Sequence, residues 1–228
     1  MKVNVLTLYP EMFPGSLGYS LAGKALSEGK VVLNVVNIRD FATDNYKSVD
    51  DTPFGGGAGM VMKPQVLDAA IAATYTHGPL YYLSPRGEVF NQSTARTWTT
   101  CDEMTFICGR FEGVDERVLE KWQIREISIG DFVLSGGEPA LITMLDAMIR
   151  LLPAVMGNAE SANEESFAGG LLEYPQYTKP QNWEGREVPA VLTSGHHARI
   201  RQWRLAQSEL LTKTRRPDLW TKYLANQQ

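Results

Sequence analysis

The chain of 228 residues is 43% hydrophobic and 21% charged, a composition that is ordinary for a soluble globular protein. Its apolar runs are all shorter than the roughly 18 residues of a membrane-spanning helix, and its two cysteines and three histidines offer neither a disulfide framework nor a zinc-ligand spacing. We therefore expect a cytoplasmic protein without a metal site.

The net charge of −4 conceals two unlike segments. Residues 1–178 hold 13 Lys and Arg against 22 Asp and Glu, a balance of −9, whereas residues 179–228 hold 9 against 4, a balance of +5. A basic segment that follows an acidic body predicts contact with a polyanion. A solvated surface helix with surplus arginine would give the same balance, so composition leaves both interpretations open.

Five short apolar runs are predicted to be strands. The first of them lies at the N-terminus and is too short and too polar to be a signal peptide. Most are rich in β-branched residues and nearly uninterrupted, a pattern typical of strands that are buried on both faces of a sheet. The predicted strands are residues 2–8, 30–38, 79–83, 104–108 and 125–129.

Helical patterns separate these runs. Pro64 precedes the segment 65–73, Asp115 can cap the segment 116–123, and Pro139 stands near the start of a long apolar run at 140–152. Strands that alternate with helices predict an α/β fold with a mostly parallel sheet.

Three of the predicted strands run into unusual loops, at residues 84–87, 109–113 and 128–138. Because the carboxyl ends of parallel strands meet at one edge of a sheet, we expect these loops to enclose one small molecule. Glycine tolerates positive φ and close approach of a ligand, so the chemistry of the three loops favours backbone contacts over redox or nucleophilic side chains.

The segment 51–62 contains Gly55-Gly56-Gly57-Ala58-Gly59, which cannot build a core strand. It lacks the Lys-Ser/Thr of a phosphate-binding P-loop and the spacing of the dinucleotide fingerprint. The segment is either a functional loop that another molecule approaches closely or a flexible hairpin.

Small, polar and acidic residues dominate between positions 157 and 173, which predicts a mobile linker. A Pro- and aromatic-rich stretch follows, and then a helix is predicted at about 196–211. We expect this helix to have a packed face and a basic face. The packed face would hold Ile200, Trp203, Ala206 and Leu210, and the basic face would hold His197, Arg201 and Arg204.

An ordered set of motifs resembles the bacterial tRNA (guanine-N1)-methyltransferases, which belong to the SPOUT class of trefoil-knotted methyltransferases. The motifs are Gly55-Gly56-Gly57-Ala58-Gly59-Met60, Tyr82-Leu83-Ser84-Pro85, the run Gly109-Arg110-Phe111-Glu112-Gly113 with its continuation to residue 117, and the segments 128–138, 171–180 and 188–197. They cover almost the whole chain, and an ordered set is far more specific than one glycine loop.

The resemblance implies a SPOUT-type, mostly parallel sheet with a deep C-terminal trefoil knot, followed by a small helical domain. Residues 1–157 would form the knotted S-adenosylmethionine-binding domain, residues 158–172 a flexible interdomain linker, and residues 173–228 a small helical tRNA-binding domain. True knots are rare, so the knot is an expectation from the family alone.

In the family, the knotted loops hold the methyl donor S-adenosyl-L-methionine. An adenine ring needs an apolar slot, which Leu83, Ile129 and Leu134 can supply, and Glu112 would lie near the ribose or the methionine portion. Phe111 and Phe132 stand where the family often has Tyr. Carried over, the cofactor-binding residues are Tyr82, Leu83, Ser84, Pro85, Gly109, Glu112, Ser128, Ile129, Gly130, Asp131, Phe132, Val133, Leu134, Gly136, Gly137 and Ala140.

The methyl acceptor in the family is N1 of the guanine immediately 3′ of the tRNA anticodon. N1 carries a proton at neutral pH, so a carboxylate must remove it and a cation can stabilise the charge that develops at O6. The family uses an Asp and an Arg, and this chain has Glu165 and Arg150 at those positions. The extra methylene of Glu165 can cost about a hundredfold in rate if the loop does not adjust. Without the resemblance, Arg150 would be explained as a cation at a helix C-terminus.

The resemblance also implies a homodimer with active sites shared between subunits, and assistance by Mg²⁺. Basic side chains would hold the tRNA backbone, and the target guanine would be unstacked into the site. The RNA-binding residues would be Gly55, Gly56, Gly57, Ser166, Arg199, Arg201 and Arg204.

Two alternatives stay open. One is a SPOUT methyltransferase that acts on another RNA atom, such as a ribose 2′-oxygen. The other is a tRNA- or cofactor-binding protein with weakened or lost catalysis, motivated by Glu165 and by the missing tyrosine hydroxyls.

Overall fold

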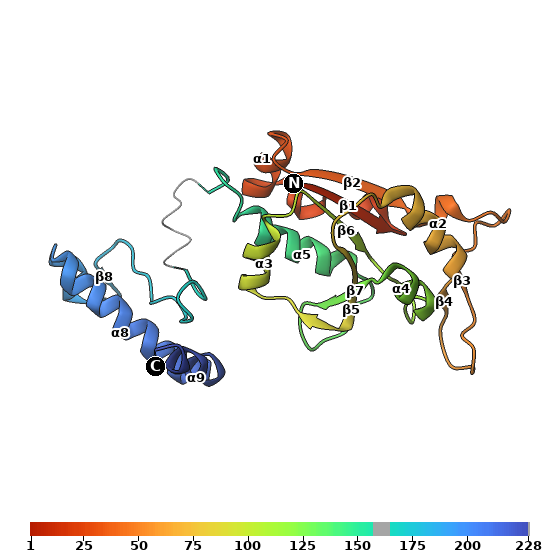
Figure 1. Cartoon of the computed structure of the whole chain (residues 1–228). Coiled ribbons are helices and arrows are strands. Elements are labelled where there is room, and N and C mark those ends of the chain that lie inside the picture. Colours follow the sequence, from red (N-terminus) through yellow and green to blue (C-terminus); the bar gives the residue numbers. More distant parts are fainter. Residues whose placement is uncertain (157–164, 228) are drawn as a thin grey trace. The chain divides into compact units, whose positions relative to one another are not determined.

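A five-stranded sheet forms the centre of the N-terminal part of the chain (Figure 1). Its strands run in the order β2-β1-β6-β5-β7, and every pairing between them is parallel. The predicted parallel α/β sheet is therefore confirmed. The strands are β1 (Lys2–Thr7), β2 (Val32–Asn37), β5 (Leu80–Val89), β6 (Glu103–Ile107) and β7 (Arg125–Ser128).

The computed structural model describes residues 1–156 and 165–227. By its internal contacts, the chain divides into two compact units, Met1–Gly157 and Asn158–Gln228. Within the described residues, no helix combines the length and the hydropathy that spanning a bilayer requires.

Side chains of the central strands alternate between two hydrophobic clusters, one on each face of the sheet. Val5 of β1 and Phe106 of β6 belong to the first cluster, whereas the residues that follow them, Leu6 and Ile107, belong to the second. Successive side chains of a strand point to opposite faces, so a strand that is covered on both faces is apolar at nearly every position. This is why the strands appear as uninterrupted apolar runs.

Helices cover both faces of the sheet (Figure 1). The first cluster is completed by α1 (Ser20–Ser27), α3 (Gln92–Trp98) and α5 (Glu138–Ile149), and the second by α2 (Pro64–Thr74) and α4 (Glu116–Trp122). The predicted helices α2, α4 and α5 are confirmed within a few residues. Helices α1 and α3 were not predicted, because each buries only two side chains and so gives little periodic signal.

Strand β5 continues past its predicted end at Leu83, so the segment 84–87 is not a loop beyond the strand, as expected, but lies within it. Ile127 of β7 pairs with both Leu83 and Glu88, and residues 84–87 between them bulge out of the ladder. An added Cβ at Gly87 would meet the backbone of Glu126 and Ile127, so glycine lets the two strands approach closely.

The glycine-rich segment joins a short antiparallel hairpin of β3 (Asp50–Asp51) and β4 (Val61–Met62). The hairpin follows a 3₁₀ turn at Ile38–Phe41, and two further 3₁₀ turns, Pro10–Met12 and Gly15–Gly18, follow β1.

The second unit is built on α8 (His197–Arg215), flanked by α7 (Ala190–Thr193) and α9 (Pro217–Ala225). A small hairpin of β8 (Asn182–Trp183) and β9 (Arg186–Glu187) precedes them. The predicted helix is confirmed as α8 and is longer than expected.

The predicted packed face of α8 is wrong in part. Ala206 is exposed and Leu210 is 57% exposed, whereas Ser208 and Thr212 are buried. Thr212 Oγ1 donates to the carbonyl of Ser208 at 2.7 Å and accepts from Leu172 N at 2.8 Å. The helix packs in part through small polar residues, which a search for an apolar stripe overlooks.

The predicted linker lies partly outside the described residues, which resume at position 165. From there the chain forms a hydrogen-bonded turn, in which Phe167 N donates to Leu171 O at 2.8 Å and Glu173 N donates to Ser166 Oγ at 3.0 Å. With the bond from Leu172 to α8, residues 165–172 are attached to the second unit.

Candidate functional site

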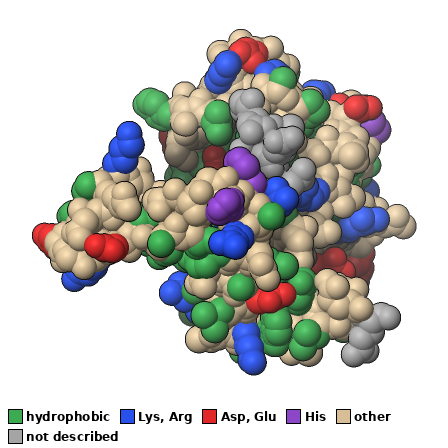
Figure 2. Space-filling model, turned by 90° about the vertical axis from the view of Figure 1, so that its left-hand side faces the viewer, with side chains coloured by type: hydrophobic (Ala, Val, Ile, Leu, Met, Phe, Trp, Pro, Cys, Tyr) green, Lys and Arg blue, Asp and Glu red, His purple; other side chains and the backbone are tan. Residues whose placement is uncertain are grey.

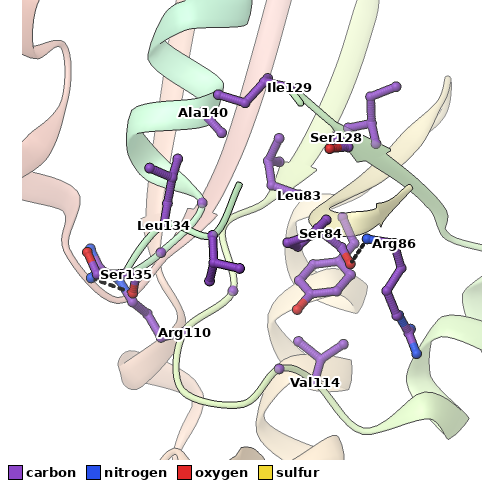
Figure 3. A pocket seen from close by; sticks show the side chains of 18 of the residues that line it. Leu83, Ser84, Arg86, Arg110, Val114, Ser128, Ile129, Leu134, Ser135 and Ala140 are labelled. Atoms are coloured by element: carbon purple, nitrogen blue, oxygen red, sulfur yellow. Dashed lines mark hydrogen bonds between the residues drawn. The ribbon is translucent and has the colours of Figure 1, made fainter. Parts of the chain in front are cut away.

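A cavity of about 340 Å³ lies at the carboxyl edge of the sheet (Figure 3). Its size falls within the range of roughly 300–1,000 Å³ that is typical of small-molecule sites. Three segments line it, at residues 82–86, 109–114 and 127–140. These are the segments that the sequence predicted to meet at one edge.

The cavity gathers the residues that were predicted to hold the cofactor, except Asp131, which is exposed and not part of the lining. The predicted residues that line it are Tyr82, Leu83, Ser84, Pro85, Gly109, Glu112, Ser128, Ile129, Gly130, Phe132, Val133, Leu134, Gly136, Gly137 and Ala140. Sequence reasoning missed Arg86, Arg110, Phe111, Gly113, Val114, Ile127 and Ser135. Each of these residues lies in the same sequence segment as residues that were predicted, and this proximity was the signal that could have identified them.

Apolar side chains enter the cavity from different elements. In Figure 3, Leu83 comes from β5, Leu134 from the segment between β7 and α5, and Ala140 from the first turn of α5. Burial raises the pKa of the Tyr82 hydroxyl, so this group stays protonated and neutral at physiological pH. The arrangement offers an apolar slot with hydroxyl and backbone groups beside it.

Two glycines allow the walls of the cavity to pack against each other. Gly137 N donates to Gly109 O at 3.2 Å. An added Cβ at Gly137 would lie 2.8 Å from the Cα of Cys108 and 3.0 Å from the Cβ of Leu83, and one at Gly109 would lie 2.5 Å from the ring of Tyr82. The φ of Gly137 is −77°, so close approach, rather than backbone conformation, requires glycine there.

A buried ion pair joins two of the lining segments. Arg110 Nη2 lies 2.9 Å from Oε2 of Glu138, a side chain with no exposed surface. Thr7 Oγ1 donates to Glu138 Oε1 at 2.6 Å, and Arg110 Nη1 donates to the carbonyl of Ser135 at 3.1 Å. A buried carboxylate requires such partners, and here they fix the segment that precedes α5 against the end of β6.

Arg86, the second arginine of the lining, also forms ion pairs with carboxylates. Arg86 Nη2 lies 3.0 Å from Glu116 and 2.9 Å from Glu126, and hydrogen bonds with these carboxylates raise the pKa of the Arg86 guanidinium. Glu112 is the carboxylate within the lining itself.

The two predicted catalytic residues belong to different units. Arg150 is the C-cap residue of α5 in the first unit, where its Nη2 donates to Met156 Sδ at 3.4 Å. Glu165 is half-buried at the start of the described part of the second unit, and its carbonyl accepts from Ala168 N at 3.1 Å.

The predicted RNA-binding glycines lie in the β3–β4 loop. Gly55, Gly56 and Gly57 have φ values of +88°, +77° and +120°, and no described atom lies within 4 Å of a Cβ added at any of them. The loop therefore leaves open space beside its backbone.

The predicted RNA-binding arginines differ in exposure. Arg199 and Arg201 are exposed on α8, whereas Arg204 is half-buried, with its guanidinium 4.7 Å from the centre of the Tyr174 ring. Arg204 therefore presents less of its side chain at the surface of α8 than Arg199 and Arg201 do. On the face shown in Figure 2, Lys and Arg side chains lie interspersed with hydrophobic ones.

Comparisons with known proteins agree over nearly the whole chain. The family model described as "tRNA (Guanine-1)-methyltransferase TrmD" matches residues 1–222. A tRNA (guanine-N(1)-)-methyltransferase of Rhodospirillum rubrum is 58% identical over 226 residues, which cover 99% of this chain and 95% of that protein. The proteins of the same name from Bartonella tribocorum and Agrobacterium fabrum are 59% and 58% identical, over 100% and 97% of this chain and 98% and 96% of theirs.

Proposed function

Because the chain belongs to the tRNA (guanine-1)-methyltransferase family, we propose that it transfers a methyl group from S-adenosyl-L-methionine to N1 of the guanine immediately 3′ of the anticodon in tRNA. The observation that carries this proposal is the family match over residues 1–222. The cavity that the three predicted segments form supports it. The motif order favours N1 over another RNA atom as the methyl acceptor.

The cavity fits the methyl donor. Leu83, Ile129 and Leu134 provide an apolar wall for an adenine ring, and Gly109, Gly136 and Gly137 contribute backbone without side chains to the lining. The carboxylate of Glu112 suits the cationic groups of the methionine portion. When bound, S-adenosyl-L-methionine supplies a methyl group on a sulfonium, which is activated for transfer to a nucleophile.

We assign the proton transfer to Glu165 and the stabilisation of charge to Arg150. Glu165 would take the proton from guanine N1, and Arg150 would stabilise the negative charge that develops at O6. The turn that carries Glu165 is held by the hydrogen bond from Glu173 N to Ser166 Oγ, which restricts the backbone next to this proposed general base.

The second unit is proposed to hold the tRNA. Arg199 and Arg201 are exposed cations on one helix, and contacts from them to phosphates would make the affinity for tRNA depend on salt. The trefoil knot, the homodimer with shared sites, the flexible linker, the cytoplasmic location and assistance by Mg²⁺ stay predictions from the sequence and the family.

Exchange of Glu165 tests the assignment of the base. Glu165→Gln keeps the size of the side chain but cannot accept the proton, so we expect the rate of methyl transfer to fall by about 100-fold or more. Glu165→Asp restores the family's residue and should keep or raise the rate. The measurement is single-turnover transfer of labelled methyl groups to a tRNA transcript, with mapping of the modified nucleotide.

Glu184→Gln is a matched control, because Glu184 is an exposed carboxylate in the β8–β9 turn. A transcript without guanine 3′ of the anticodon should take up no label. Full turnover by Glu165→Gln would remove Glu165 as the base. Wild-type protein that binds both tRNA and the methyl donor but transfers no label would instead favour a protein with lost catalysis.

A further inference from the structure

Phe54 is the most exposed large hydrophobic residue among those the structure describes, at 99%. It lies at the tip of the β3–β4 loop, where Gly56 N donates to the carbonyl of Pro53 at 3.2 Å and closes a turn around Phe54 and Gly55. Single exposed apolar side chains are common on protein surfaces, so exposure alone assigns no role. The attachment of the loop to the cavity wall and the charge of the loop together indicate a role for this ring.

The loop is fixed to the wall of the cavity. Glu112 N donates to the carbonyl of Met60 at 2.9 Å, and Met62 N donates to the carbonyl of Gly113 at 2.9 Å. Met62 also forms a parallel bridge with Val114. Glu112, Gly113 and Val114 all line the cavity, so the β3–β4 hairpin is attached to the site where the methyl group would be transferred.

Gly59 tightens this attachment. An added Cβ at Gly59 would meet the side chain of Glu112, with Cδ at 2.8 Å. The C-terminal side of the loop therefore packs closely on the cavity wall, while the tip of the β3–β4 loop extends away from the sheet (Figure 1).

The charge of the loop determines which part of an RNA it can contact. Residues 50–62 contain Asp50 and Asp51 and neither Lys nor Arg. Phosphates would be repelled by this segment, whereas the face of a nucleobase is uncharged and stacks on aromatic rings. The space beside Gly55, Gly56 and Gly57 leaves room for a base next to the ring.

We propose that Phe54 is a stacking platform for an unpaired base of the tRNA substrate, close to the guanine that is methylated. The inference rests on the proposed function, because it takes a tRNA with an unpaired anticodon loop as the ligand. It assigns a base contact to the first unit, in addition to the proposed phosphate contacts of the second.

Phe54→Ala removes the ring and should lower kcat/KM for methylation of a tRNA transcript about tenfold. Affinity for S-adenosyl-L-methionine, measured by calorimetry, should be unchanged, and Phe54→Trp should restore activity because it restores a stacking surface. Tyr46→Ala is the matched control, since Tyr46 is also an aromatic residue that is 92% exposed but lies outside the glycine loop. It should behave as wild type.

Salt dependence separates stacking from phosphate contact. The plot of log Kd for tRNA against log salt concentration should keep its slope in Phe54→Ala, whereas Arg201→Ala should reduce the slope by about one unit. A 2-aminopurine placed beside the target guanine should be quenched on binding to wild-type protein and to Phe54→Trp, and not on binding to Phe54→Ala.

Wild-type activity and tRNA affinity in Phe54→Ala would overturn the inference. So would full rescue by Phe54→Leu, which indicates an apolar contact that needs no aromatic face, or loss of S-adenosyl-L-methionine affinity in Phe54→Ala, which indicates a role in the cavity itself. If the wild-type protein methylated no guanine, the proposed function would fail. The salt and fluorescence measurements with tRNA would still test Phe54.

Discussion

Glu103 and Glu138 are two buried carboxylates at opposite edges of the same sheet. Glu103 begins β6 at the amino edge, where it accepts hydrogen bonds from Asn4 Nδ2 at 2.7 Å and Thr76 Oγ1 at 2.8 Å. Glu138 begins α5 at the carboxyl edge and pairs with Arg110 beside the cavity. A buried charge requires polar or charged partners, and each of these carboxylates has them. Only Glu138 lies next to the cavity.

Glu103 should make folding stability sensitive to acid. The hydrogen bond from Thr76, assisted by Asn4 and Lys2, lowers the pKa of the Glu103 carboxyl below its usual value. Because the pKa is lower in the folded state than in the unfolded state, the stabilisation is complete above about pH 4.3 and is lost as the pH falls through the folded-state pKa.

Glu103→Gln should therefore lower the free energy of unfolding at pH 7 by about 1–3 kcal/mol and weaken its decline in acid. Urea unfolding at pH 7 and at a series of lower values down to about pH 2, which passes through the lowered pKa, measures both effects. Glu120→Gln, at an exposed position on α4, should change neither. An acid dependence that is identical in Glu103→Gln and wild type would contradict this role.

At the scale of elements, the first turn of α5 forms part of the cavity wall. Its cap, Gly137, packs on the backbone of Cys108 at the end of β6, as the 2.8 Å distance of an added Cβ to Cys108 Cα shows. Helix and sheet therefore meet through backbone atoms, which cannot move aside as a flexible side chain can.

Gly137→Ala should displace α5 from the end of β6. We expect a loss of about 1–3 kcal/mol in the free energy of unfolding and a clearly lower affinity for S-adenosyl-L-methionine, measured by calorimetry. Gly169→Ala is the matched control, because no described atom lies within 4 Å of a Cβ added there and its φ lies outside the left-handed region. Unchanged stability and affinity in Gly137→Ala would show that the wall adjusts.

The sequence could predict most of these elements but not how they are joined. Uninterrupted β-branched runs predicted a parallel sheet, because such strands are buried on both faces. The strand order and the bulge in β5 depend on partners far along the chain, so local patterns do not carry them. The helices α1 and α3 were missed because few of their residues are buried.

The site was predictable chiefly through resemblance. The apolar wall of the cavity includes residues from the motifs that carried the resemblance, such as Leu83 and Leu134. The pair of Arg110 and Glu138 could not be predicted, because it joins positions 28 residues apart that only the tertiary fold brings together. The packed face of α8 was predicted wrongly in part because the search for that face considered only apolar residues. Thr212 is buried, and its polar hydroxyl group is satisfied by a hydrogen bond to the carbonyl of Ser208.

At the scale of the whole molecule, the proposed homodimer can be tested by complementation. If each site takes Arg150 from one subunit and Glu165 from the other, a mixed dimer of Arg150→Ala and Glu165→Gln has one site with both changes and one with neither. Co-expression of the two inactive variants should then restore about a quarter of wild-type activity.

Sedimentation of the wild-type protein provides the control for this experiment, because a monomer would contradict the dimer directly. Mixed dimers that form but stay inactive would show that each site takes both residues from the same subunit. Activity well above that of either variant alone would support the shared site.

The positions of the two buried carboxylates also bear on how such a protein can diverge. The acid sensitivity that we predict for folding stability arises partly in a cluster at the amino edge of the sheet, around Glu103, Asn4 and Thr76. The cavity lies at the carboxyl edge, at the far end of the same strands. Substitutions that adapt the fold to a new pH can therefore accumulate at one edge while the geometry of the site at the other is retained.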